Sequence, residues 1–360
     1  MAVKPKSLKA APAPSPPSGG RVAGKRHSLL LAVDFSKASR IALEAARAMA
    51  KDLGADIVLL HASSPAPPPI PFSHDRETET LAAGRIAAGD AARLSSEWAE
   101  ELRGDGIRVQ VVNPIGPPVK EILAEAETRN SRAIIVGTTG RTGLKDWVLG
   151  SVAREVLRRS KVPVLVAPLR MQVDKSGAPV ASASKTILVG VDFSTESEAA
   201  YEAALRLAHD LKARLHVLHV TELATANVPF PLGAEISVEL MEADEERAAT
   251  NIAELASKAR ALKVGVNPSL GLGHPASVIL AEARQTGASL IIVGTHGKSA
   301  ARRFLLGSVA EQVVQLSDRP VLVIPDPKGR EPGDLMRSDA GAKAKASSST
   351  GRRAPKPSKP

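Results

Sequence analysis

Short runs of Val, Ile and Leu recur along the chain, and segments with helical periodicity separate them. The runs lack polar alternation, which indicates strands covered on both faces, as in a parallel sheet. In the first half, the predicted strands are 28–34, 57–62, 107–113, 133–137 and 162–168. The predicted helices between them are 36–54, 75–104, 119–129 and 150–160. This alternation predicts an open, doubly wound, five-stranded α/β sheet of the Rossmann-like kind, which binds ligands where the strand order reverses.

The whole pattern occurs twice. LLLAVDFS at 29–36 returns as ILVGVDFS at 187–194, and AIIVGTTG at 133–140 returns as LIIVGTHG at 290–297. Every repeated block is shifted by 157 or 158 residues. A constant shift of this size indicates that an entire domain is duplicated, because solenoid repeats are much shorter.

The duplication predicts where the domains begin and end. We expect a first unit at 28–168 and a second unit at 185–326, joined by a polar linker at 169–184. Within the first unit, Ser36 is placed to cap a helix and Gly54 to end it. The proline-rich stretch 65–72 is expected to be a loop, because it suits neither a helix nor a central strand.

Most of the positive charge lies outside the two units. Residues 1–27 and 327–360 each carry a net charge of +6, so the total of +10 leaves −2 for the body. Both tails are rich in Pro, Ala, Ser and Lys, and we expect them to be disordered. They serve either as solubilising extensions or as weak contacts to DNA or other polyanions.

The composition excludes several classes of protein. The chain has no cysteine, so it holds no disulfide, thiolate metal site or cysteine nucleophile. Aromatic residues make up 2%, which argues against modules that stack bases on Phe or Tyr. No apolar run reaches the roughly 20 residues that a membrane span needs. The N-terminus lacks the apolar region of a secretory signal, so a cytoplasmic protein is expected.

Glycines follow the fourth strand and open the last helix of each unit. Gly137, Gly140 and the Gly150-Ser151 pair return as Gly294, Gly297 and the Gly307-Ser308 pair. Glycine lets a ligand approach the backbone closely, and a helix N-terminus suits phosphate. The spacing matches neither the Walker pattern nor the dinucleotide fingerprint. Ser151 and Ser308 either cap their helices or donate to phosphate, and the glycines alone are also compatible with purely structural turns.

Asp34 and Asp192 follow the first strand of each unit, in the sequence Val-Asp-Phe-Ser. Each carboxylate either binds a ribose hydroxyl or the water shell of a metal, or stabilises the helix that follows. His61 and His219 recur at the end of the second strand, and we interpret them as hydrogen-bonded core histidines. The first unit has Thr139 at the position equivalent to His296, which argues against a catalytic histidine shared by both units. The sequence contains no evident nucleophile and base pair.

These residues resemble the universal stress protein family. The pattern Gly-x2-Gly-x9-Gly-Ser occurs in both units and is similar to that family's ATP-binding signature, and Val-Asp-Phe-Ser and Val-Pro-Val-Leu-Val also fit. The resemblance covers 28–168 and 185–326 and implies an adenine nucleotide α-hydrolase-like fold. It also implies that 162–168 and 319–325 pair within the chain as an intramolecular pseudo-dimer. Whether the chain also forms a homodimer is left open.

The resemblance implies one nucleotide site in each unit. Asp34 and Asp192 would lie beside the nucleoside, Ala62 and Val220 would present backbone to adenine, and magnesium or manganese would bridge the phosphates. In the first unit the expected binding residues are Ala32, Val33, Asp34, Ala62, Val136, Gly137, Gly140, Gly150, Ser151 and Val152. In the second unit they are Gly190, Val191, Asp192, Val220, Val293, Gly294, Gly297, Gly307, Ser308 and Val309.

The function expected from the resemblance is that of an ATP-binding stress-response or regulatory protein, with AMP or ADP as other possible ligands. A slow ATPase or nucleotidyl transferase is a first alternative, and it would need a catalytic carboxylate or histidine in both units. A regulator that binds nucleic acid through its basic tails is a second alternative. Thr139 at the position of His296 argues against the first alternative, and deletion of the tails would abolish salt-sensitive DNA binding if the second were right.

Overall fold

The computed structural model describes residues 27–63, 74–138, 149–171, 185–222, 234–295 and 306–326. The tails, most of the predicted linker, the predicted loop 65–72, and Thr139, Gly140, His296 and Gly297 lie outside these residues. None of the helices in the described segments is long and apolar enough to cross a membrane.

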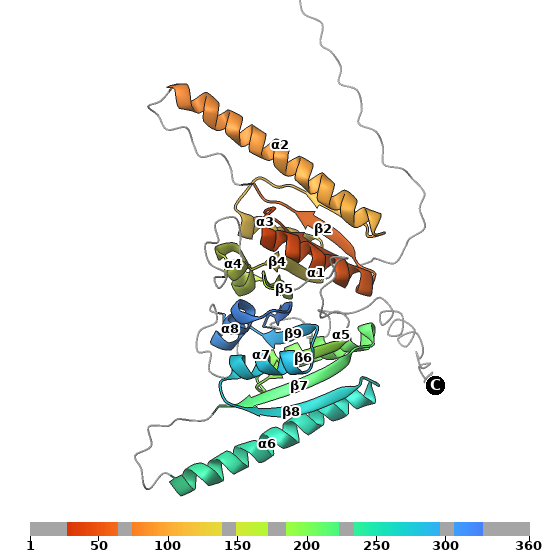
Figure 1. Cartoon of the computed structure of the whole chain (residues 1–360), viewed down its shortest axis with the longest axis vertical. Helices are drawn as coiled ribbons and strands as arrows, with labels where there is room; N and C mark the ends of the chain where they lie inside the picture. The colour runs from red at the N-terminus through yellow and green to blue at the C-terminus, as the bar shows by residue number, and fades with distance from the viewer. Residues whose placement is uncertain are drawn as a thin grey trace, which may run out of the picture.

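The first unit contains the alternating strands and helices that the hydrophobic pattern predicts (Figure 1). Its strands are β1 (Ser28–Ala32), β2 (Asp56–Leu60), β3 (Val109–Val112), β4 (Ala133–Gly137) and β5 (Val164–Ala167). Its helices are α1 (Lys37–Leu53), α2 (His74–Gly104), α3 (Pro118–Thr128) and α4 (Ser151–Arg159). The predicted strand 28–34 is two residues too long. The Val33 N–H still donates to the Leu60 carbonyl of β2 at 2.9 Å, but Asp34 already belongs to the turn that begins α1.

The second unit repeats this order. Its strands are β6 (Thr186–Val191), β7 (Arg214–Thr221), β8 (Val266–Leu272), β9 (Leu290–Gly294) and β10 (Val321–Ile324). Its helices are α5 (Thr195–Leu211), α6 (Ala234–Ala261), α7 (Pro275–Gln285) and α8 (Ser308–Leu316). The long helices α2 and α6 lie at opposite ends of the molecule (Figure 1).

The ten strands of the described segments form one sheet, in the order β3-β2-β1-β4-β5-β10-β9-β6-β7-β8. Within each unit the neighbouring strands are parallel. The predicted α/β fold with two doubly wound, parallel five-stranded units is therefore confirmed. The strand order reverses beside β1 in the first unit and beside β6 in the second.

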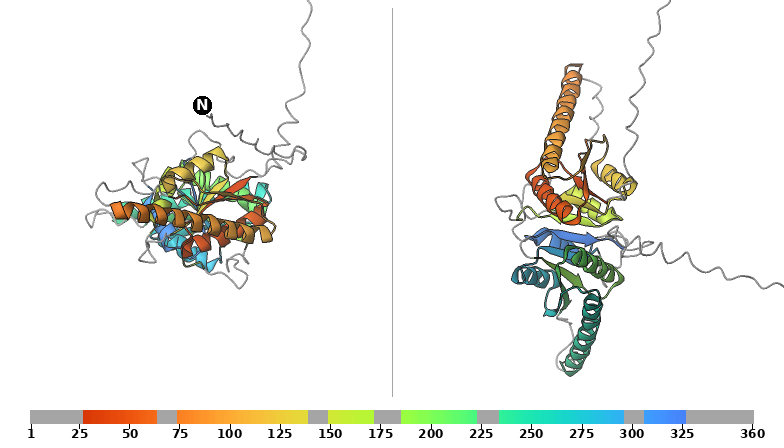
Figure 2. Two further views of the ribbon diagram at one scale, coloured as in Figure 1. Left: turned by 90° about the horizontal axis from the view of Figure 1, so that it is seen from above. Right: turned by 90° about the vertical axis from the view of Figure 1, so that its right-hand side faces the viewer.

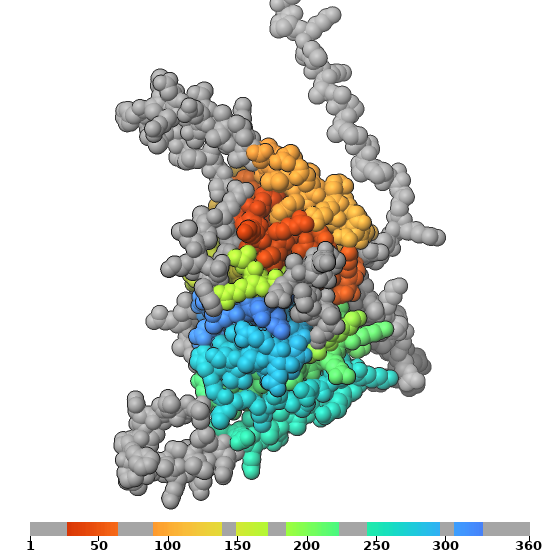
Figure 3. Space-filling view, in the orientation of Figure 1, coloured from red at the N-terminus to blue at the C-terminus, as the bar shows by residue number. Residues whose placement is uncertain are grey.

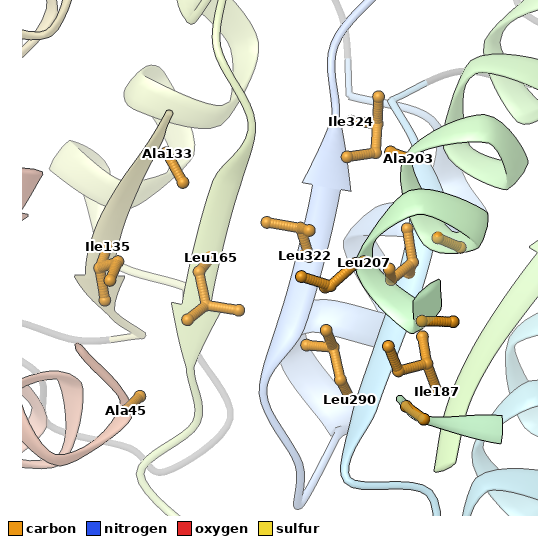
Figure 4. Packing of buried hydrophobic residues seen from close by; sticks show 14 of the residues in the cluster. Ala45, Ala133, Ile135, Leu165, Ile187, Ala203, Leu207, Leu290, Leu322 and Ile324 are labelled. Carbon is orange, nitrogen blue, oxygen red and sulfur yellow. The ribbon is translucent and has the colours of Figure 1, made fainter. Parts of the chain in front are cut away.

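The two units meet through their last strands. β5 and β10 pair antiparallel, with Leu165 opposite Leu322 and the flanking valines opposite one another. Leu165 and Leu322 are equivalent in the repeat, since they differ by 157 positions, so a pseudo-twofold axis passes between them. Figure 4 shows these two side chains on the facing strands of the junction. The intramolecular pseudo-dimer predicted from 162–168 and 319–325 is confirmed.

Helices cover both faces of the sheet, and each face has a hydrophobic core that extends through both units. One core joins buried residues of α1, α2, α5 and α6 to the sheet, and the other joins those of α3, α4, α7 and α8. Figure 2 shows the helices on either side of the strands, and Figure 3 shows the two units in contact along the junction. Because both cores continue across the junction, the units pack as one body.

The predicted ends of the first helix are confirmed. Ser36 caps α1 by accepting a hydrogen bond from the Ser39 N–H at 3.2 Å, and Gly54 ends the helix in the left-handed conformation with φ 60°. In α5 the equivalent cap is Ser194, which forms a reciprocal capping box with Ser197. Since an N-cap oxygen satisfies amides that have no partner within the helix, these two helix starts are closed by side chains.

Candidate functional site

The point where the strand order reverses brings three segments together in each unit. In the first unit these are the turn after β1, the end of β4 and the start of α4. The Gly150 N–H donates to the Thr138 carbonyl at 2.7 Å, which ties the start of α4 to the end of β4. In the second unit, the Gly307 N–H donates to the Thr295 carbonyl at 2.8 Å. The repeated glycines 137 and 150, and 294 and 307, are thus brought to the same edge of the sheet.

Asp34 and Asp192 lie in the turns that start α1 and α5. Oδ1 of Asp34 accepts hydrogen bonds from the Ser36 N–H at 3.1 Å and from the Ser39 hydroxyl at 2.6 Å. Oδ1 of Asp192 accepts from the N–H and the hydroxyl of Ser194 at 3.1 and 2.5 Å. Both carboxylates therefore support the helix that follows, as one of the two sequence interpretations expects. This role holds each carboxylate at the point where the strand order reverses.

Phe35 and Phe193 adopt the left-handed backbone conformation, with φ 62° and 59°. This conformation costs a non-glycine residue roughly 1–2 kcal/mol, so packing must hold it. The Phe35 ring lies 4.8 Å from the His61 ring, and the Phe193 ring lies 4.5 Å from the His219 ring, between centroids. The sequence analysis missed this role of the phenylalanines, although the repeated Val-Asp-Phe-Ser block carried the signal.

His61 and His219 hold the ends of the first strands. Nδ1 of each ring donates to a backbone carbonyl at 2.8 Å, that of Val33 in the first unit and that of Val191 in the second. The predicted hydrogen bonding of these histidines is confirmed, but both side chains are half-buried rather than fully inside the core. They position the turn that carries Asp34 or Asp192.

Gly137 and Gly294 have a packing role that the sequence did not reveal. A Cβ atom added to Gly137 would lie 2.7 Å from the backbone carbonyl of Ala38, at the start of α1. At Gly294 it would lie 3.0 Å from the carbonyl oxygen of Glu196, at the start of α5. A side chain at either position would push the helix away from the sheet, so these glycines set the distance between the turn after the first strand and the end of the fourth.

The starts of α4 and α8 differ from those of α1 and α5. Gly150 and Gly307 occupy the N-cap positions, and no side chain among the described residues caps either helix. Ser151 and Ser308 follow the caps and are exposed, so the sequence interpretation in which they cap the helices is wrong. The first amides of each helix therefore have no side-chain partner from the cap, at the positive end of the helix dipole.

The other predicted residues fall into two groups. Ala32, Val33, Val136, Val191 and Val293 have buried side chains, so only their backbone is available to a ligand. Ala62, Gly190, Val220 and Val309 are half-buried and Val152 is exposed, at the ends of strands or in the first turns of α4 and α8. Among the described residues, no group of three or more His, Asp or Glu side chains could hold a metal ion.

A buried histidine outside this site was missed by the sequence analysis. His216, in the middle of β7, places Nε2 at 3.0 Å from Oε1 of Glu282, and its Nδ1 lies 2.9 Å from the Asn267 amide nitrogen. Burial lowers the pKa of His216 below its usual value, and Glu282 opposes this effect. In a neutral ring, Nδ1 accepts the hydrogen bond from the Asn267 amide, and Nε2–H lies in close contact with the Glu282 carboxylate.

In the first unit, an arginine rather than a neutral histidine contacts the equivalent carboxylate. Arg129, the C-cap residue of α3, donates to Glu125 at 2.5 Å and to Gln110 at 2.6 Å. Glu125 and Gln110 are the repeat equivalents of Glu282 and Asn267. The first unit has Val58 at the position of His216, and the second unit has Thr286 at the position of Arg129. The carboxylate is therefore contacted from the end of the helix in the first unit and from the strand in the second.

Comparison with known proteins agrees with this architecture. The model of the universal stress protein family matches residues 25–168 and again residues 183–325. The chain is 28% identical over 309 residues to a universal stress protein of Mycobacterium tuberculosis, covering 83% of this chain and 97% of that protein. It is 35% identical over 144 residues to a universal stress protein of Bacillus subtilis, covering 38% of this chain and 97% of that protein.

Solved structures show the same fold. The crystal structure of a universal stress protein from Archaeoglobus fulgidus aligns with a TM-score of 0.61 and 25% identity, over 84% of this chain and 97% of that one. With a family match in each half and one sheet joining them, the chain belongs to the universal stress protein family as a tandem, two-domain member.

Proposed function

We propose that each unit binds one adenine nucleotide, with ATP as the main ligand and AMP or ADP as alternatives, and that the chain acts as a stress-response regulator. The observation that carries the proposal is the start of α4 and of α8, where a glycine is the N-cap and no side chain of the described segments caps the first amides. Free amides at a helix N-terminus suit phosphate oxygens. The same arrangement stands in both units, at the point where the strand order reverses.

The residues around this point fit a nucleotide. In the proposal, Gly150, Ser151 and Val152, with Gly307, Ser308 and Val309, hold the phosphates, and Gly140 and Gly297 contribute from outside the described residues. Asp34 and Asp192 lie next to the ribose. The backbones of Ala62 and Val220 face the adenine. Magnesium or manganese is held through the phosphates.

We propose that occupancy of the sites, rather than turnover, is the signal. The two units differ at the position of Thr139 and His296, where a shared catalytic group would be expected to be the same. Support for the regulatory role comes from membership of the family, while the nucleotide rests on the glycine pattern and the uncapped helices. The binding experiment below tests the nucleotide separately from the role.

Replacing both N-cap glycines by aspartate should strongly weaken nucleotide binding at both sites without unfolding the protein. Gly150 and Gly307 have φ and ψ near −60° and 150°, a conformation that any N-cap residue adopts. An Asp N-cap stabilises a helix by about 0.5–2 kcal/mol relative to alanine, yet its charge repels phosphate. We expect at least about a tenfold loss of affinity at each altered site.

Calorimetric titration with ATP and magnesium measures this effect. The wild-type chain should bind one nucleotide per unit, and Gly150→Asp and Gly307→Asp should each remove one of them. The isosteric, uncharged variants Gly150→Asn and Gly307→Asn are the matched controls and should retain more affinity. A wild-type chain that binds no ATP at millimolar concentration would reject the proposal. Aspartate variants that bind like the wild type would show that the phosphates lie elsewhere.

A further inference from the structure

An ion pair crosses the junction between the units on the face covered by α4 and α8. Nε of Arg154 lies 3.5 Å from Oε1 of Glu311. Both residues stand in the first turns of their helices, and they differ by 157 positions. They are therefore equivalent in the repeat, and their contact lies at the pseudo-twofold axis. In Figure 1, α4 and α8 lie next to one another across this junction.

At a twofold axis, each residue contacts the equivalent residue of the other unit. If the first unit paired with a copy of itself, Arg154 would meet Arg154, and in a pair of second units Glu311 would meet Glu311. Only the pairing of a first with a second unit puts opposite charges together. We propose that Arg154 and Glu311 make this junction selective for unlike units, so that each unit recognises the other and not itself.

The strands themselves cannot supply this selectivity. The paired segment is Val-Leu-Val at 164–166 and again Val-Leu-Val at 321–323. A ladder of identical residues has the same side-chain contacts whether like or unlike units pair. The discrimination must therefore come from groups beside the strands, where the sequences of the two units differ.

The helices beside the strands differ in charge. The first unit has Arg154-Glu155-Val-Leu-Arg158 where the second has Glu311-Gln312-Val-Val-Gln315. Gln315 donates to Glu311 at 3.1 Å, which holds the acceptor in place on α8. Glu155 pairs with Arg158 at 2.8 Å on its own helix, which leaves Arg154 to reach across the junction.

The strength of the pair sets the size of the effect to be measured. The side chains of Arg154 and Glu311 are 42% and 33% exposed, so water and salt screen their attraction. Reversal of one charge removes the attraction and adds a repulsion, while the apolar strands keep the units together. The expected consequence is more frequent opening of the junction, and not unfolding.

Charge reversal in the full chain reproduces the like-unit contacts directly. Arg154→Glu puts Glu opposite Glu, as in a pair of second units, and Glu311→Arg puts Arg opposite Arg, as in a pair of first units. Hydrogen exchange at the amides of β5 and β10 reports opening of the junction. At low salt we expect each single variant to exchange about three- to tenfold faster than the wild type, and high salt should reduce the difference.

The exchanged pair R154E/E311R is the decisive variant, because it restores opposite charges with the same composition. It should return the exchange rates of β5 and β10 to near the wild-type values. The control for Arg154→Glu is Arg93→Glu on the distant helix α2. It makes the same change of net charge as Arg154→Glu and should leave the junction unaffected. Single variants that exchange at the wild-type rate, or an exchanged pair that opens as readily as the single variants, would overturn the proposal.

Discussion

Replacing Gly137 by alanine is expected to lower the stability of the first unit by about 2–3 kcal/mol. The added Cβ would lie 2.7 Å from the backbone of Ala38, so the first turn of α1 would have to move away from β4. Because Asp34 is hydrogen-bonded to Ser36 and Ser39 at this helix start, the displacement should reach the proposed nucleotide site. Chemical denaturation followed by tryptophan fluorescence measures the effect, since both tryptophans, Trp98 and Trp147, belong to the first unit.

Two glycines of the second unit make the comparison specific, with circular dichroism as the probe because that unit has no tryptophan. At Gly294 the nearest backbone atom is 3.0 Å from an added Cβ, so Gly294→Ala should be less destabilising than Gly137→Ala. At Gly190 the nearest atom is the side-chain Cδ1 of Ile279, also at 3.0 Å, which can rotate away. The first unit already has Ala32 at that position. If Gly190→Ala were as harmful as Gly137→Ala, the packing explanation would fail.

Replacing His216 by valine, the residue of the first unit, is expected to destabilise the second unit by about 2 kcal/mol. The Asn267 amide would lose its hydrogen bond to the ring, and the Glu282 carboxylate would lose its close contact with Nε2. The double variant H216V/T286R should recover much of this loss, because it installs the arginine arrangement of the first unit. Denaturation followed by circular dichroism compares the three proteins, and a double variant no better than the single one would contradict the interpretation.

The same histidine predicts a dependence of stability on pH. Burial holds the pKa of His216 in the folded protein below its ordinary value of 6.5. Below pH 6.5 the unfolded chain therefore binds a proton that the native ring does not, so the second unit loses stability as the pH falls. In H216V/T286R this contribution should disappear, since arginine stays charged. Denaturation midpoints measured on both sides of that pH test the sign.

Much of the fold follows from hydrophobic periodicity and from the duplication. The runs of Val, Ile and Leu predicted the strands because a strand covered on both faces has no polar alternation. Ser36 and Gly54 predicted the ends of α1 because capping is local chemistry that depends on a few neighbouring residues. Errors occur where the chain leaves the sheet. The Val33 N–H still donates to the Leu60 carbonyl at 2.9 Å, whereas Asp34 already belongs to the turn that precedes α1, and hydrophobicity alone does not mark that boundary.

The site was less accessible to sequence reasoning. The glycine pattern pointed to the correct edge of the sheet, but it could not separate glycines that face a ligand from Gly137 and Gly294, which admit a neighbouring helix. That distinction depends on contacts between residues far apart in the sequence. His216 escaped notice for the same reason, since its partners lie on β8 and α7, 51 and 66 positions away.

The pairing of β5 with β10 also limits growth of the sheet. β5 and β10 are equivalent edge strands of the two units, and they pair with one another. Neither edge is then left to pair with a further strand, as in any closed, isologous assembly. The remaining edges are β3, with four residues, and β8, which contains Pro268. β3 is short, and Pro268 of β8 has no backbone N–H to donate, so both edges are poor templates for another strand. The two units of the tandem chain thus form a closed pair with little tendency to polymerise through its sheet.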